Sequence, residues 1–117
     1  MQRVFWGLAL CFVAAAIFHA AAIVVPSLAG ASPPWRHGLF ALVNALVAIG
    51  LVRRPRGFVL AFALLTAQQL LSHGRDVVVE WEGAHQVDWA SVMVVVVMPI
   101  VLFLLVRDAR VPQTPRG

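Results

Sequence analysis

Charged side chains are scarce in this chain. Of its 117 residues, 12% are charged and 62% are hydrophobic, and the mean hydropathy is +0.90. A soluble domain of this size has too little interior to hide so much apolar surface. The scarcity of charge therefore excludes an ordinary soluble domain and predicts an integral membrane protein whose main partner is the lipid bilayer.

Cysteine is nearly absent as well. Cys11 is the only one, so the chain can form no intramolecular disulfide and no CxxC motif, and a thiol-exchange enzyme is excluded. The sequence also lacks a Gly-rich phosphate loop, a catalytic-triad motif and an internal repeat. Its formal charge of +4 comes from arginines beside apolar runs, a pattern typical of membrane anchoring, and we expect no nucleic-acid partner.

Four apolar runs predict four transmembrane helices, at about 4–25, 34–53, 57–73 and 89–106. A span needs about 20 apolar residues, and the uninterrupted apolar parts of the two middle helices, 39–52 and 58–71, are shorter than this. Ser32 and Asp88 are candidate N-caps for the second and fourth helices. We expect an all-α integral membrane protein: one domain, 1–117, folded as an antiparallel four-helix transmembrane bundle. The outer loop 74–88 should follow the membrane surface, and the tail 108–117 should fray.

The arginines predict the orientation. Two of them, Arg36 and Arg75, fall on one side of the four predicted spans, and seven fall on the other: Arg3, Arg53, Arg54, Arg56, Arg107, Arg110 and Arg116. Because arginine-rich ends stay in the cytoplasm, both termini should be cytoplasmic in a multi-pass protein of the cell inner membrane. An alternative interpretation makes residues 1–22 a cleaved secretory signal peptide, although no soluble domain follows it.

All four histidines fall in the outer half of the predicted bundle, at His19, His37, His73 and His85. Helical spacing places other polar side chains on the same stripes: Asn44 lies seven residues after His37, and Gln69, His73 and Asp76 follow one another at i, i+4 and i+7, with Gln68 beside them. Polar groups that face lipid are costly, so these stripes should face one another. The sequence thus predicts a polar pocket in the outer leaflet.

Each residue of this pocket has a candidate role. Acid–base chemistry would use His19, His37, His73 and Asp76, while Asn44, Gln68, Gln69, Glu80 and His85 would bind a ligand. The helix dipole favours a neutral His37 near a helix start and a protonated His73 near a helix end. His19, His37 and His73 are also the metal-ligand candidates, but no HxxxH or ExxH motif supports a metal, and the cofactor stays unknown.

Three functions fit this pattern. The leading one is a small accessory or ligand-binding protein that uses the outer histidine-rich pocket, with a small lipophilic ligand, other membrane subunits or a second copy as partner. The alternatives are a membrane-embedded enzyme acting on a lipid-soluble substrate and a small oligomeric transporter. A plainer interpretation makes Asn44, Gln68 and Gln69 interhelical contacts, and makes His85 and the nearby acids a solvated surface.

Overall fold

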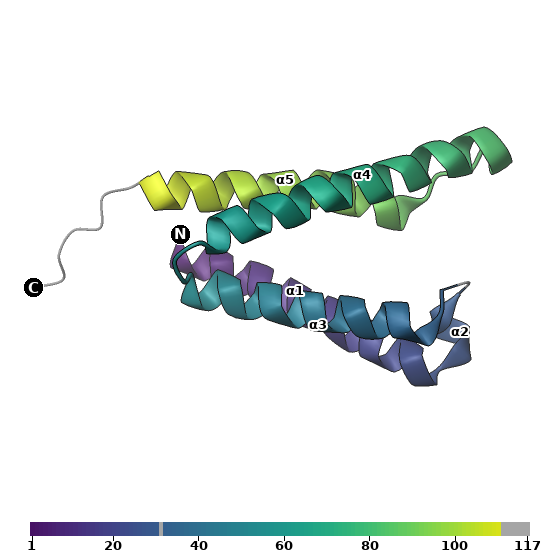
Figure 1. Cartoon of the computed structure of the whole chain (residues 1–117), viewed down its shortest axis with the longest axis horizontal. Helices are drawn as coiled ribbons and strands as arrows, with labels where there is room; N and C mark the ends of the chain where they lie inside the picture. Colours follow the sequence, from purple (N-terminus) through teal and green to yellow (C-terminus); the bar gives the residue numbers. More distant parts are fainter. Residues whose placement is uncertain (31, 111–117) are drawn as a thin grey trace, which may run out of the picture. The chain divides into compact units, whose positions relative to one another are not determined.

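The computed structural model describes residues 1–30 and 32–110, and every regular element in these ranges is a helix. The helices are α1 (Gln2–Val24), α2 (Pro26–Ala29), α3 (Pro34–Arg53), α4 (Phe58–Ala84) and α5 (Trp89–Arg110) (Figure 1). They form two compact units, one covering Met1–Pro55 and one beginning at Arg56. The all-α class predicted from composition is confirmed, and each unit is a helical hairpin.

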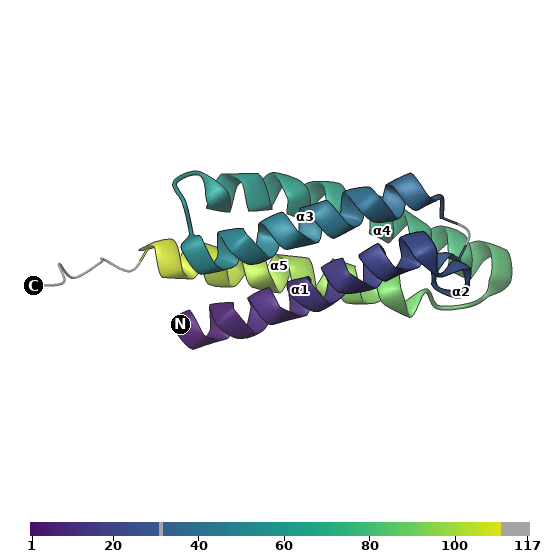
Figure 2. The same ribbon diagram turned by 90° about the horizontal axis from the view of Figure 1, so that it is seen from below.

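The N-terminal hairpin pairs α1 with α3, which lie side by side in both ribbon views (Figures 1 and 2). Pro26 ends α1 and begins the short α2, because proline fits the first turn of a helix but not its interior. Ala9 and Ala48 are almost fully buried, as expected where two backbones approach closely. At the far end α3 stops at Arg54, which adopts a left-handed conformation with φ 46°.

The C-terminal hairpin pairs α4 with α5. The predicted cap of α5 is confirmed, because the Ser91 backbone N–H donates to the Asp88 carboxylate at 3.1 Å. The cap predicted for α3 is wrong. Pro33 occupies the N-cap position and no side chain caps this helix, while the Ser32 backbone N–H donates to the Ala29 carbonyl at 3.2 Å.

The structure differs from the sequence-based expectation in the second half of α4. The helix does not end at residue 73 with an outer loop 74–88; it continues to Ala84, and only residues 85–88 connect it to α5. A single glycine such as Gly74 costs a helix about 1 kcal/mol and does not end it. The helix stops at His85, which adopts a left-handed conformation with φ 52°. Likewise α5 runs through residue 106 to Arg110, and the rest of the predicted tail, 111–117, lies outside the described residues.

Within the described part of the chain, three helices are long and apolar enough to cross a membrane: α1, α3 and α5. α4 does not meet this standard, because its apolar first half is followed by Gln68, Gln69 and a charged second half. Large apolar side chains such as Leu10, Leu42 and Phe103 are at least half exposed on the spans. Such surfaces suit lipid and not water, which supports a membrane protein.

Candidate functional site

The most closely connected polar group on the hairpins is a pair of histidines. His19 lies near the end of α1 and His37 in the first turn of α3, and the reversal of the chain through α2 brings the two rings together. Their Nδ1 atoms are 3.0 Å apart, and His37 Nε2 lies 3.0 Å from the Ala29 carbonyl oxygen. Only 6% of the His37 surface is exposed. The pair therefore links both helices of the hairpin to the connection between them.

The chemistry of these atoms fixes where the protons lie. A carbonyl oxygen can only accept, so His37 Nε2 must donate a proton to Ala29 O. In neutral His37 the Nδ1 atom is then an acceptor, and the hydrogen across the 3.0 Å contact belongs to His19 Nδ1. Neutral His19 consequently carries its free lone pair on Nε2. The pair offers one basic nitrogen, with a hydrogen-bonded path behind it that ends on a backbone carbonyl.

Aromatic rings surround the His19 end of the pair. The His19 ring meets Phe18 edge-on at 5.5 Å between centroids and lies against Phe40 at 5.3 Å. The Arg36 guanidinium sits 5.7 Å above the Phe40 ring, a cation–π contact. The histidines are thus flanked by apolar faces, with one positive charge nearby. Such walls reduce competition from water and strengthen any hydrogen bond to a ligand.

The C-terminal hairpin contains a second, simpler histidine contact. His73 Nδ1 lies 2.8 Å from the Ser91 hydroxyl, and Ser91 is 3% exposed. Hydrogen bonds from Ser91, first from its hydroxyl and then from its backbone N–H, hold the pKa of the Asp88 carboxyl below its usual range. A hydroxyl that donates to Asp88 must accept from His73 Nδ1. This histidine therefore joins α4 to the capped start of α5.

Other predicted pocket residues are engaged locally or face outward. The Asn44 amide donates to the Phe40 carbonyl of its own helix at 2.8 Å, about 10 Å along α3 from His37. The Gln69 amide donates to its neighbour Gln68 at 2.6 Å. Three further members of the predicted pocket are exposed: Asp76, Glu80 and His85.

These positions bear on the metal ligands and on the charge of His73 that the sequence predicts. In the described ranges no group of three or more His, Cys, Asp or Glu side chains is placed to hold a metal ion, and within its own hairpin His19 pairs with His37 while His73 pairs with Ser91. The dipole argument for a charged His73 loses its basis, because α4 continues to Ala84 and His73 is not near a helix end. His37 does lie in the first turn of α3, as that argument required.

Comparisons with protein-family models, with curated proteins and with solved structures found no match to this chain. The site therefore has to be interpreted from its own atoms. Sequence reasoning did not identify three of its parts: the Ala29 carbonyl, Phe40 and Arg36. A backbone acceptor leaves no signal in a sequence, but the i, i+4 spacing of Arg36 and Phe40 could have suggested their contact.

Proposed function

We propose that this chain is a small inner-membrane protein that binds a ligand through the outer-side histidine pair His19–His37, acting as an accessory or ligand-binding protein. The observation that carries the proposal is the His19–His37 contact at 3.0 Å, anchored on the Ala29 carbonyl. A hydrogen-bonded network that links two membrane helices fixes the orientation of both rings. It leaves His19 Nε2 as an acceptor for one hydrogen-bond donor of a ligand.

The proposed ligand is a small lipophilic molecule with one acidic or hydroxyl group. The apolar rings of Phe18 and Phe40 favour an apolar body, and His19 Nε2 would accept the hydrogen of the polar group. Arg36, which lies over Phe40, would attract an anionic form of the same ligand. A partner subunit that places such a group against the pair would be recognised in the same way.

We further propose that the two hairpins form one four-span bundle with both termini in the cytoplasm. In that bundle α4 would cross the membrane as well, in addition to α1, α3 and α5. The His73–Ser91 hydrogen bond supports this proposal, because it sets α4 residues 58–73 beside the apolar length of α5. These sixteen residues cover about 24 Å, close to the hydrocarbon thickness of about 30 Å. His19, His37 and His73 would all lie in the outer half, as the arginine count predicts.

Thiol labelling in whole cells tests the topology. In a Cys11→Ala background, Pro55→Cys precedes α4 and Gln86→Cys follows it, and both positions are exposed. A membrane-impermeant maleimide should label Gln86→Cys from outside and reach Pro55→Cys only after permeabilisation. If both positions react alike in intact cells, α4 does not cross the membrane and the four-span proposal fails.

Mass spectrometry of the protein purified from its own membrane tests ligand binding. The wild-type protein should carry a small molecule that organic solvent extracts, and His19→Leu should lose it. His85→Leu is the matched control, because His85 is exposed and contacts Trp81, outside the pair. A wild-type protein with no extractable molecule, or His19→Leu protein that keeps it, would contradict the proposal.

A second candidate function is an enzyme that performs acid–base chemistry on a lipid-soluble substrate. It is favoured by the direct contact between two imidazole nitrogens, along which a proton can pass from His19 Nδ1 to His37 Nδ1 when His19 Nε2 takes one up from a substrate. His37→Gln, compared with His19→Leu, separates the two functions. An enzyme with His37→Gln should still bind its substrate and should lose turnover, whereas a binding protein should lose affinity with both histidine variants.

A further inference from the structure

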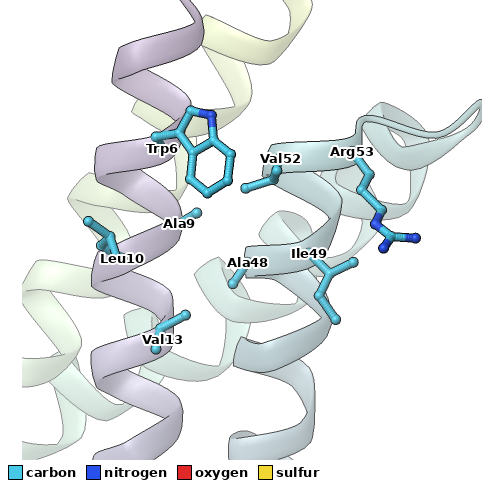
Figure 3. Close-up of a pocket in the computed structure, with 8 residues that line it drawn as sticks. All are labelled: Trp6, Ala9, Leu10, Val13, Ala48, Ile49, Val52 and Arg53. Atoms are coloured by element: carbon cyan, nitrogen blue, oxygen red, sulfur yellow. The ribbon is translucent and has the colours of Figure 1, made fainter.

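An apolar groove of about 240 Å³ runs between α1 and α3 at the end of the hairpin opposite the histidines (Figure 3). On α1 it extends from Trp6 to Val13, about 10 Å along the helix. Ala9 and Ala48 form its floor, since they are the almost fully buried members of the lining. Trp6, Leu10 and Ile49 form exposed walls. The groove is therefore open to the surroundings of the two spans.

One end of this groove is basic. Arg53, the last residue of α3, belongs to the lining and is exposed; its guanidinium extends away from α1 (Figure 3), so its charge lies at the mouth of the groove and not inside it. Its neighbour Arg54 points elsewhere, with its guanidinium 4.8 Å from the centre of the Phe5 ring. Arg56 follows within the same turn of chain and is exposed but is not part of the lining. Of these three arginines, only Arg53 lines the groove.

We propose that this groove binds one acyl chain of an anionic phospholipid, with the lipid phosphate paired to Arg53. Both walls belong to candidate membrane spans, so the groove lies where acyl chains are present. The basic end matches the negative headgroup, and basic sites between helices on the cytoplasmic side are suited to such lipids. A helix from a second protein would fill the apolar part but would leave Arg53 without a counter-charge. This proposal is independent of the histidine pair.

Quenching of Trp6 fluorescence by brominated lipids tests the proposal. The protein would carry Trp35→Phe, Trp81→Phe and Trp89→Phe, so that Trp6 is the only tryptophan. It would be reconstituted in phosphatidylcholine vesicles with a minor, equal fraction of brominated phosphatidylglycerol or brominated phosphatidylcholine. We expect the anionic lipid to be enriched at Trp6 by about fivefold, the order of one arginine–headgroup attraction.

Matched charge variants make the test specific. Arg53→Gln should abolish the preference for phosphatidylglycerol, whereas Arg56→Gln, which removes the same charge outside the lining, should keep most of it, and Arg53→Lys should restore part of it. Helical circular dichroism checks that each variant is folded. Equal quenching by both lipids would overturn the proposal, and so would equal losses in Arg53→Gln and Arg56→Gln. A Trp6 that neither lipid quenches would mean that protein fills the groove, which also overturns it.

Discussion

The two hairpins each join their helices through a histidine, but they do so in different ways. In the N-terminal hairpin His37 is bonded on both ring nitrogens, to His19 and to the Ala29 carbonyl. In the C-terminal hairpin the contact of His73 is with the hydroxyl of Ser91, a residue that also takes part in the cap of α5. A hydroxyl oxygen has two lone pairs and can accept from several directions, whereas an imidazole nitrogen accepts along one fixed direction. The His19–His37 contact therefore depends on both imidazoles, whereas other donors could take the place of His73 beside the Ser91 hydroxyl.

The largest expected loss of unfolding free energy comes from His37→Leu. This change leaves His19 Nδ1 without its partner and removes one hydrogen bond from Ala29 O. Hydrogen bonds between membrane helices contribute about 0.6 kcal/mol each and at most about 1.7, so the loss of both should cost about 1–2 kcal/mol. Reversible unfolding in mixed micelles measures this free energy. A cost below that of His73→Leu would contradict the comparison.

A slightly smaller loss of unfolding free energy is expected when the N-cap of α5 is removed. Asp88→Ala removes an N-cap that is bonded to Ser91 at 3.1 Å, and such caps contribute about 1 kcal/mol. Ser32→Ala is the matched change before α3, where no side chain caps the helix, and it should stay within about 0.5 kcal/mol. The same unfolding experiment compares both variants. A larger loss for Ser32→Ala would reverse the assignment of the caps.

A double-mutant cycle on His73 and Ser91 should give a coupling of about 0.6 kcal/mol, the average for polar contacts between membrane helices. The variants His73→Leu and Ser91→Ala, alone and together, measure it. The corresponding cycle on His19 and His37 should give the larger coupling, because both partners are imidazoles held in fixed orientations. Equal couplings would remove the distinction between the two hairpins.

The smallest effect is on pH dependence and is confined to the C-terminal hairpin. The folded-state pKa of Asp88 lies below its ordinary value of 3.8, so the ionised carboxylate contributes stability above that pH. The contribution falls as the pH drops from 3.8 through the folded-state pKa. Asp88→Asn should remove this dependence and leave the unfolding free energy flat in that range. An unchanged acid response in Asp88→Asn protein would assign it to another group.

The helical class and the apolar spans could be predicted because composition and apolar run length depend on the sequence directly. The extent of α4 could not, since Gly74 and the charges after it suggest a surface segment, while the helix continues through them to Ala84. Which polar side chains contact one another was harder still to predict. Helical spacing places His37 and Asn44 on one face of the helix, but the Asn44 amide donates to the Phe40 carbonyl of its own helix. Which histidines meet depends on how α2 turns the chain, and no spacing rule records that turn.

The imidazole nitrogens of His19 and His37 offer the most direct test of the central claim, that these two side chains form one hydrogen-bonded unit. Nitrogen-15 NMR of the histidine-labelled protein in bilayers or micelles can detect coupling across a hydrogen bond. We predict coupling between the two Nδ1 atoms, with the neutral His37 ring protonated on Nε2 and the neutral His19 ring on Nδ1. Absence of that coupling, with a neutral His37 ring protonated on Nδ1, would contradict the account.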